Sequence, residues 1–342
     1  MIGDMEDHEV TLEQEIADTS AGRPHFLLLG AGASRAALPD GDKNGRPVPL
    51  LQEVADDLGL VEYFPEDLKE LARTNFESAY SQLFDREDPV IDKVNGLVRE
   101  YFSTLELPDK PNLYDIINLS LREKDAIFTF NWDPFLIQSR IRLAALGITD
   151  KFPKLFFLHG NVMVGYCEKD ETSGVVGQMC SRCGTVFKPS QLLFPVEHKD
   201  YQADPFIKRE WAAAQHYLKG CLMFTSFGYS APVTDKEAID LLKNGWGDIN
   251  DRDMEQTEII NRPGADKERL RDTWDPFIHT HHYDVLESFY DSFIAKHPRR
   301  SIEAYWNQYF ETKFISNNTV PKSFDSFDEL EKWFKPILDA ES

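Results

Sequence analysis

Short apolar runs that end in glycine or small polar residues recur along this chain. The first run covers residues 26–29 and stops at the segment 30–34, Gly-Ala-Gly-Ala-Ser. Four apolar side chains in succession predict a strand buried on both faces, and the glycines predict a tight turn with a helix after it. Backbone N–H groups of such a turn can bind a pyrophosphate, although many glycine-rich turns are only tight connections.

Four more β-prone runs follow at residues 126–130, 155–158, 221–227 and 258–260, with helical patterns between them. This alternation predicts an α/β fold with a Rossmann-type, mostly parallel sheet and helices on both faces. Ligands of such sheets bind at the carboxyl ends of the strands. The polar residues expected at those ends are Asn131 and Asp133, His159, Gly228 and Ser230, and Asn261.

The segments around these runs give the expected domain organisation. Residues 1–22 are acidic and polar and predict a mobile or loosely docked arm. Residues 23–284 form the expected main domain, with a helical insert at about 50–123 and a small cysteine-containing module at about 161–200. The spacing of apolar residues predicts helices over 285–342, packed on that domain.

Three Asp-Pro-Phe triplets, which begin at Asp133, Asp204 and Asp275, each predict a helix start. Aspartate is a favoured helix cap, and proline is favoured at the first helical position. For Asp204 and Asp275 this structural interpretation is sufficient.

The charge balance narrows the range of partners. The 342 residues include 37 Lys and Arg against 59 Asp and Glu, a formal charge of −22, and no dense basic block offsets it. Direct nucleic-acid binding is therefore disfavoured, because clustered positive charge binds phosphate backbones. The chain has no apolar run of about 18 residues, and its first twenty residues lack the order of a signal peptide. We expect a folded cytoplasmic protein that does not interact with membranes.

Four cysteines are too few for a disulfide scaffold of this length, so we expect reduced thiols or a metal site. Cys180 and Cys183 have the spacing of a zinc knuckle, and Cys167 can supply a third thiolate. Val164 stands where a paired knuckle would have a cysteine, so the tetrahedron lacks one ligand. Cys221 lies in an apolar run and is expected to pack in the core. The fourth ligand is expected among Glu168, Asp170 and His198, and the alternative is a vestigial loop without zinc.

A second group of potential metal ligands, His279, His281 and His282, lies near an expected helix start. Solvated or packed side chains are commoner there than a metal site. We therefore expect no metal at these histidines.

Five motifs occur in the order found in sirtuin-like proteins. They are the glycine-rich segment 30–34, the segment 129–133, Leu158-His159-Gly160, the Cys-x-x-Cys pair and Gly228-Tyr229-Ser230. With these motifs, over roughly residues 25–262, the chain resembles the sirtuin-like superfamily. The resemblance implies a Rossmann-type sheet that binds NAD, with a smaller module beside it.

The same resemblance implies roles for individual residues. The pyrophosphate would contact Gly30, Ala31, Gly32 and Ser34. The adenosine half would lie near Gly228, Ser230 and Asn261. Around the reacting bond, Asn131 would lie by the nicotinamide ribose, Asp133 by the carboxamide, and His159 would be the general base.

The residue types suit that chemistry. An imidazole such as His159 can take a proton near neutral pH, and the neutral amide of Asn131 can bind water or a ribose hydroxyl without adding charge. Asp133 can accept a hydrogen bond from the carboxamide. The structural alternatives are a histidine with satisfied hydrogen bonds at a strand end and a pure helix cap at Asp133.

Three segments depart from the sirtuin deacylases. Residues 37–42 lack the Phe and Arg of Gly-Ile-Pro-Asp-Phe-Arg, residues 130–133 read Phe-Asn-Trp-Asp instead of Gln-Asn-Ile-Asp, and residues 194–197 read Phe-Pro-Val-Glu where the deacylases have Phe-Gly-Glu. Loss of that glycine removes the close backbone approach that holds an extended peptide.

Residues 76–80 and 298–301 also resemble the bacterial sirtuin-like proteins that hydrolyse NAD in antiviral defence. The sequence therefore predicts an NAD glycohydrolase that yields nicotinamide and ADP-ribose. A homo-oligomer or a regulatory partner is expected to restrain it. The alternatives are an NAD-dependent protein deacylase and a non-catalytic sensor of NAD or ADP-ribose.

Overall fold

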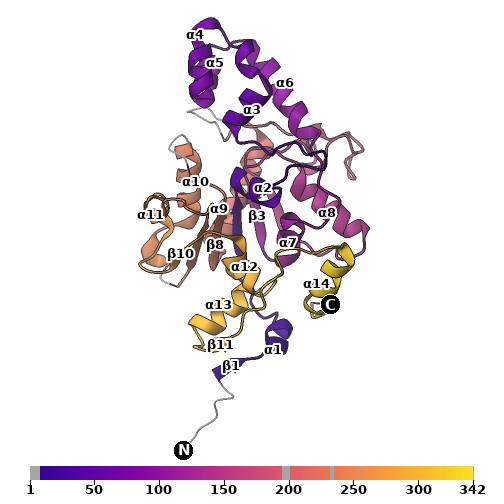
Figure 1. Cartoon of the computed structure of the whole chain (residues 1–342), viewed down its shortest axis with the longest axis vertical. Helices are drawn as coiled ribbons and strands as arrows, with labels where there is room; N and C mark the ends of the chain where they lie inside the picture. Colours follow the sequence, from indigo (N-terminus) through magenta and orange to yellow (C-terminus); the bar gives the residue numbers. More distant parts are fainter. Residues whose placement is uncertain (1–7, 195–200, 232–234, 253, 342) are drawn as a thin grey trace, which may run out of the picture.

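The computed structural model describes residues 8–194, 201–231, 235–252 and 254–341. A six-stranded, fully parallel sheet with the order β10-β9-β8-β2-β3-β4 lies at its centre (Figure 1). All carboxyl ends therefore lie at one edge. The strands are β2 (His25–Leu29), β3 (Ala126–Thr129), β4 (Lys154–Phe157), β8 (Met223–Phe227), β9 (Gln256–Ile260) and β10 (Tyr283–Leu286).

Helices cover both faces of the sheet, as the sequence predicts. Successive side chains of a strand point to opposite faces, so each buried strand contributes to an apolar core on either side. Leu27 and Leu29 of β2 belong to one apolar core, while Phe26 and Leu28 belong to the other. The first core includes residues of α2 (Ala31–Ala37), α7 (Leu113–Ser120), α8 (Phe135–Ala145) and α12 (Phe293–Lys296). The second includes residues of α9 (Pro205–Gly220), α10 (Lys236–Trp246) and α11 (Lys267–Trp274).

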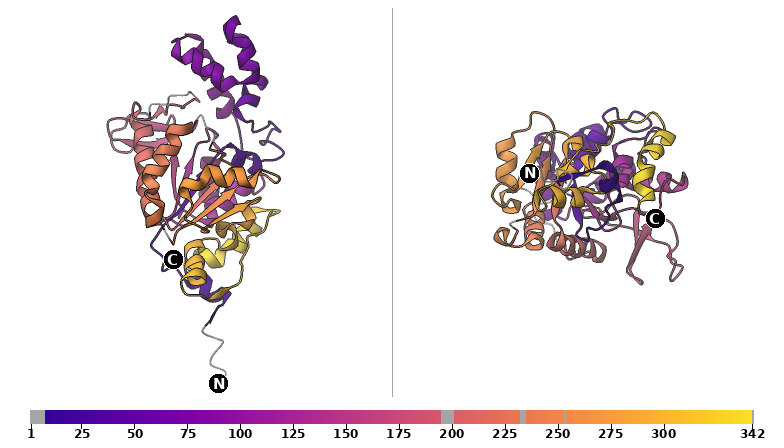
Figure 2. Two further views of the ribbon diagram at one scale, coloured as in Figure 1. Left: turned by 90° about the vertical axis from the view of Figure 1, so that its left-hand side faces the viewer. Right: turned by 90° about the horizontal axis from the view of Figure 1, so that it is seen from below.

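The helical insert extends away from the rest of the molecule, at the top of Figure 1 and in the left view of Figure 2. Phe76 and Leu83 of α5 and Val94 and Val98 of α6 are buried in the first core. The insert comprises α3 (Leu51–Asp57), the 3₁₀ helix η2 (Leu60–Tyr63), α4 (Glu66–Thr74), α5 (Phe76–Asp85) and α6 (Val90–Ser103).

The cysteine-containing module is a small antiparallel sheet with the order β6-β5-β7. Its strands are β5 (Val164–Cys167), β6 (Thr172–Val175) and β7 (Lys188–Pro189). The end of the module beyond β7 lies in residues 195–200, outside the described residues.

Residues 9–17 and the C-terminal segment lie together at the amino edge of the central sheet. Within residues 8–22, β1 (Glu9–Val10) pairs in parallel with β11 (Phe314–Ile315), and α1 (Leu12–Ala17) follows. Glu15 of α1 is buried and its Oε1 lies 2.8 Å from Nδ1 of His297. The C-terminal segment also contains α13 (Ser301–Tyr309) and α14 (Phe327–Asp339).

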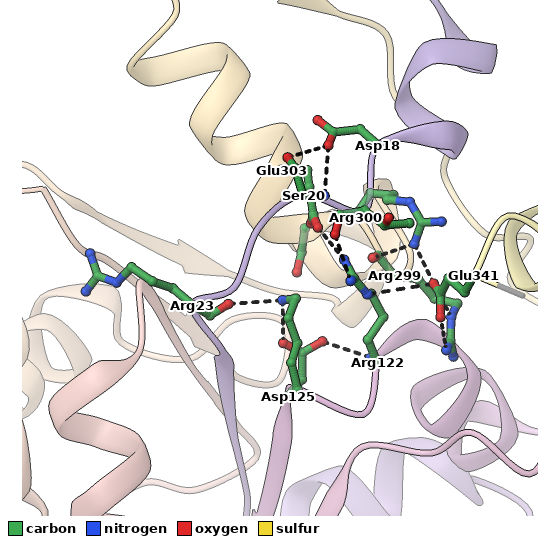
Figure 3. A network of polar contacts seen from close by, with 12 residues as sticks. Asp18, Ser20, Arg23, Arg122, Asp125, Arg299, Arg300, Glu303 and Glu341 are labelled. Atoms are coloured by element: carbon green, nitrogen blue, oxygen red, sulfur yellow. Dashed lines mark hydrogen bonds and ion pairs between the residues drawn. The ribbon is translucent and has the colours of Figure 1, made fainter.

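The Pro-Arg-Arg-Ser segment at 298–301 has a structural role at this edge (Figure 3). Arg299 and Arg300 are fully buried, and both pair with the Glu341 carboxylate at 2.5 Å. Arg300 also donates to the carbonyl of Ile16 in α1. Ser301 is hydrogen-bonded to His25 at the start of β2. The segment therefore links α1 and Glu341 to the start of β2 in the central sheet.

Three sequence predictions differ from the structure. Residues 285 and 286, expected in a helix, instead end the edge strand β10, since Tyr283–Leu286 pairs with the buried strand β9. Pro134, not Asp133, is the N-cap of α8. Asp275–Phe277 forms the 3₁₀ helix η5 at the end of α11, whereas Asp204 caps α9 as predicted. The other 3₁₀ helices are η4 (Ile249–Asp251) and η6 (Phe289–Asp291).

Across the described ranges, none of the helices is both long and apolar enough to cross a bilayer.

Candidate active site

A cavity of about 1070 Å³ lies at the carboxyl edge of the central sheet. Residues after all six strands line it, and Val54, Glu77 and Phe102 of the helical insert add to its wall. All ten non-metal residues predicted from the sequence line this one cavity: Gly30, Ala31, Gly32, Ser34, Asn131, Asp133, His159, Gly228, Ser230 and Asn261. Their convergence follows from the parallel sheet, whose strand ends share an edge.

The glycines at 30, 32 and 228 hold the turns after β2 and β8 against each other. The amide of Gly32 donates to the carbonyl of Gly228 at 2.9 Å, and Gly30 donates to Phe227 at 3.0 Å. Gly228 has a φ of +69°, and a Cβ there would lie 2.1 Å from the backbone nitrogen of Ala33. A Cβ on Gly30 would lie 2.6 Å from the carbonyl oxygen of Gly228. Close packing of two turns therefore requires glycine here, independently of any ligand.

Ser34 joins the polar groups beneath the cavity. Its hydroxyl donates to Oδ2 of Asp133 at 2.6 Å and accepts from Nδ2 of Asn131 at 2.8 Å. The Tyr114 hydroxyl lies 2.5 Å from the hydroxyl oxygen of Ser34. Asn131 uses its second amide hydrogen on the carbonyl of Gly30 at 2.9 Å. This leaves Oδ1 as the remaining hydrogen-bonding atom of the Asn131 side chain.

Asp133 is 5% exposed, and this burial raises its pKa to about 6. The hydrogen bond from Ser34 and that from the Phe135 amide, at 3.3 Å, act in the opposite direction. Asn161 fixes the backbone here by donating to the carbonyl of Asp133 at 2.6 Å. Each carboxylate oxygen has one internal donor and a further lone pair, so a carboxamide can still bind there.

His159 lies among aromatic rings at the end of β4. Its Nε2 is 3.1 Å from the Tyr201 hydroxyl, and its ring centroid lies 4.5 Å from that of Phe130. The Leu193 amide donates to the carbonyl of His159 at 2.9 Å. The imidazole is therefore held by ring contacts and its backbone by a neighbouring loop, with 8% of the residue exposed.

Helix α9 fixes the edge strand that carries His159. Glu210 accepts from the amide of Phe157 at 2.8 Å, and the indole of Trp211 donates to the carbonyl of Leu158 at 3.1 Å. Burial raises the pKa of Glu210 to about 7. These bonds satisfy backbone groups that an edge strand would otherwise expose.

Sequence reasoning did not identify Tyr201, Trp211 or the role of Tyr114 in the network. Tyr201 lies 42 positions from His159, Trp211 lies 53 positions from Leu158 and Tyr114 lies 80 positions from Ser34, and no local motif marks them. The only signal in the sequence is that all three residues are aromatic. Of the deacylase-like segment at 194–197, Phe194 packs against Tyr80 with ring centroids 5.0 Å apart, and residues 195–197 lie outside the described residues.

The three predicted metal ligands Cys167, Cys180 and Cys183 come together with Asp170, and the four ligand atoms lie within 4.8 Å of one another. The Cys167 and Cys183 sulfurs are 3.6 Å apart. Two thiolates 2.3 Å from a tetrahedral zinc lie about 3.8 Å apart, so the set fits structural zinc. Of the three expected candidates for the fourth ligand, Asp170 lies beside the thiols, while His198 lies outside the described residues.

The remaining cysteine and the three clustered histidines are not members of this group of ligand atoms in the described part of the chain. Cys221 is fully buried in the second core, where burial raises its pKa to about 12. His281 and His282 have ring centroids 4.6 Å apart just before β10. Among the described residues, the histidines at 279, 281 and 282 do not form a metal-binding group.

No protein-family model and no curated protein sequence matches the chain. Among solved structures, it is similar to a Sir2 protein in complex with an inhibitor, 2'-O-acetyl-ADP-ribose and a deacetylated p53 peptide. That likeness has 16% identity, a TM-score of 0.39 and coverage of 85% of this chain and 94% of the other. A Sir2 protein bound to an acetylated peptide gives 14% identity, a TM-score of 0.37 and coverages of 85% and 93%. A mutant Sir2 homologue in complex with ADP-ribose gives 14% identity, a TM-score of 0.39 and coverages of 86% and 96%.

Proposed function

We propose that this chain is an NAD glycohydrolase that breaks the bond between nicotinamide and ribose. The supporting observation is that His159 and Asn131, from the ends of the neighbouring strands β4 and β3, line one cavity with the glycine turn at Gly30. The sequence resemblance implies that both residues lie around the reacting bond, and their shared cavity supports this.

The dinucleotide would lie across the strand ends. From Asn261 after β9 to His159 after β4 the cavity crosses four strand spacings, roughly 19 Å, which suits an extended dinucleotide. The pyrophosphate would lie over the turn at Gly30 and Gly32, with adenosine toward Gly228, Ser230 and Asn261.

The reaction needs a positioned water and a proton acceptor. When the nicotinamide nitrogen leaves with the bonding electrons, the ribose carbon becomes oxocarbenium-like and water attacks it. Oδ1 of Asn131 can accept a hydrogen bond from that water or from a ribose hydroxyl, because its amide hydrogens are used by Gly30 and Ser34. His159 would take the proton that the water releases. Asp133 would accept from the carboxamide of nicotinamide.

Protein deacylation is the second candidate. The cavity continues beyond the strand ends between apolar side chains, including Val48, Val54, Phe102 and Leu113. An acyl group would find an apolar environment there. An acyl oxygen in place of water would then attack the ribose carbon.

A cell that contains an unrestrained NAD hydrolase loses its NAD. We therefore include in the proposal a resting state, held by a homo-oligomer or a partner protein, and a use in bacterial antiviral defence through NAD depletion. A drop in cellular NAD during phage infection of cells that express the chain, absent with His159→Ala, would support this part.

Incubation of the purified protein with NAD tests the activity directly. We expect nicotinamide and ADP-ribose, and at least a 100-fold loss with Asn131→Ala or His159→Ala. The surface variant His216→Ala should keep wild-type activity. O-acetyl-ADP-ribose from an acetylated peptide would favour the deacylase, and saturable binding without turnover would favour the sensor. Intact NAD under all these conditions contradicts the proposal.

A further inference from the structure

The hydroxyl of Tyr201 lies within hydrogen-bonding distance of the ring of the proposed base, and the reaction described above gives Tyr201 no role. Its hydroxyl oxygen lies 3.1 Å from Nε2 of His159. The two rings are nearly parallel, at 20°, with centroids 5.9 Å apart. Tyr201 is 4% exposed, so a water molecule does not readily replace its hydroxyl.

Tyr201 has rigid support of its own. Its ring meets that of Trp211 edge to face, with centroids 4.8 Å apart. The indole nitrogen of Trp211 donates to the carbonyl of Leu158, the residue before His159. One side chain of α9 therefore fixes both the backbone that carries His159 and the tyrosine that contacts its ring.

A tyrosine hydroxyl suits a base that gains and loses a proton. It can donate to Nε2 of a neutral imidazole, and it can accept from Nε2–H of the protonated ring. Burial raises the pKa of Tyr201 far above its usual value of 10, so the group remains a neutral hydroxyl throughout. The contact can therefore persist in both states of the imidazole without changing the charge of the site.

We propose that Tyr201 is a positioning residue that holds the imidazole of His159 in its working orientation before and after proton uptake. The inference rests on the proposed hydrolase function for its kinetic part. Tyr201 lies outside the five sequence motifs and acts through His159 rather than through a contact with NAD.

The test compares Tyr201→Phe with Tyr217→Phe. Both substitutions remove one hydroxyl from a tyrosine that packs in the second core, but Tyr217 lies on the outer part of α9, where its ring contacts Phe128 and Phe156. For Tyr201→Phe we expect kcat to fall about 10- to 100-fold while KM for NAD changes little, because Nε2 of His159 loses its contact with the tyrosine hydroxyl. Tyr217→Phe should match the wild type. Equal kcat in all three proteins, or equal losses in both variants, would overturn the proposal.

A second measurement is independent of catalysis. In protein labelled with ¹⁵N-histidine, the ring signals of His159 are assigned from their loss in His159→Asn. We expect Tyr201→Phe to shift those signals and Tyr217→Phe to leave them in place. If the wild type does not cleave NAD, the hydrolase proposal fails while this measurement still tests the positioning role. If Tyr201→Phe does not fold, an NOE between the rings of Tyr201 and His159 in the wild type replaces it, and its absence would refute the proposal.

Discussion

The Ser34 hydroxyl lies 2.6 Å from the Asp133 carboxylate and joins helix α2, which follows β2, to the loop after β3. The two segments follow neighbouring strands, so the bond fixes the floor of the cavity where a pyrophosphate and a nicotinamide would adjoin. The bond also lowers the pKa of Asp133, against the burial that raises it to about 6.

Ser34→Ala should therefore raise the pKa of Asp133 further. Asp133 would then remain protonated to higher pH, and a protonated carboxyl accepts from a carboxamide less well. We expect about a tenfold loss of NAD cleavage near pH 6 and a smaller loss at pH 8, measured as a pH profile of kcat/KM. Ser120→Ala is the matched control, since the buried Ser120 hydroxyl has no hydrogen-bond partner within the described residues. An unchanged profile for Ser34→Ala would contradict this role for the bond.

Gly228→Ala should destabilise the fold and weaken ligand binding together. The new methyl group would lie 2.1 Å from the backbone nitrogen of Ala33, at a φ of +69° that disfavours alanine. We expect the free energy of unfolding, measured with urea, to fall by about 2–4 kcal/mol. Gly147→Ala separates the cost of the backbone conformation from the cost of the clash with Ala33. Gly147 has a φ of +73° but open space around it, so its substitution should lower the free energy of unfolding by only about 1 kcal/mol. Equal losses would show that the contact with Ala33 has no cost.

The central fold and the convergence of the site residues could be predicted because both depend on local patterns. Residues 26–29, 126–130 and 221–227 are apolar enough to be assigned as buried strands without their partners. Once the strands are parallel, the polar residues after them must share an edge. Ligands of such sheets bind at the carboxyl edge of the strands, and the cavity lies at that edge.

Features that depend on distant contacts could not be predicted. β10 has only four residues and contains the charged Asp284, and it is a strand because β9 offers a free edge. Tyr201 meets His159 across 42 positions, and Arg299 meets Glu341 across 42 positions. Asp170 was one of three candidates for the fourth metal ligand until the hairpin geometry placed it beside the thiols.

Purified protein should contain about one zinc per chain, measured by elemental analysis. Cys183→Ser should lose it, because two thiolates and a carboxylate do not complete the tetrahedron. Asp170→Asn should weaken zinc binding at least tenfold, since a neutral amide is a poorer ligand than a carboxylate. Glu168→Gln tests a neighbouring carboxylate that is not in the group, and it should retain zinc. Absence of zinc from the wild type, even after refolding with added metal, would support the alternative of a loop with reduced thiols.

A buried chain of hydrogen bonds crosses the sheet below the site. Thr225 donates to Glu258 at 2.7 Å and lies 2.7 Å from His25, which is 2.8 Å from Ser301. The other oxygen of Glu258 accepts from the amide of Phe293 at 2.8 Å. Burial lowers the pKa of His25 to about 3, so its neutral ring can donate or accept toward Thr225 according to its tautomer. The chain can therefore accommodate either protonation state of Glu258.

Glu258 should make the protein less stable as the pH rises from about 4.5 to about 7. Burial raises its pKa from 4.5 to about 7, so in this window the folded protein holds a proton that the unfolded chain has released. The full effect is roughly 3 kcal/mol. Glu258→Gln should remove it, and the stability gained relative to wild type in urea unfolding should be larger at pH 8 than at pH 5. Glu268→Gln, on the exposed face of α11, should show no such difference. If Glu258→Gln and wild type lose stability in parallel over this range, Glu258 is ionised in the folded protein and the hydrogen-bond chain has one fixed direction.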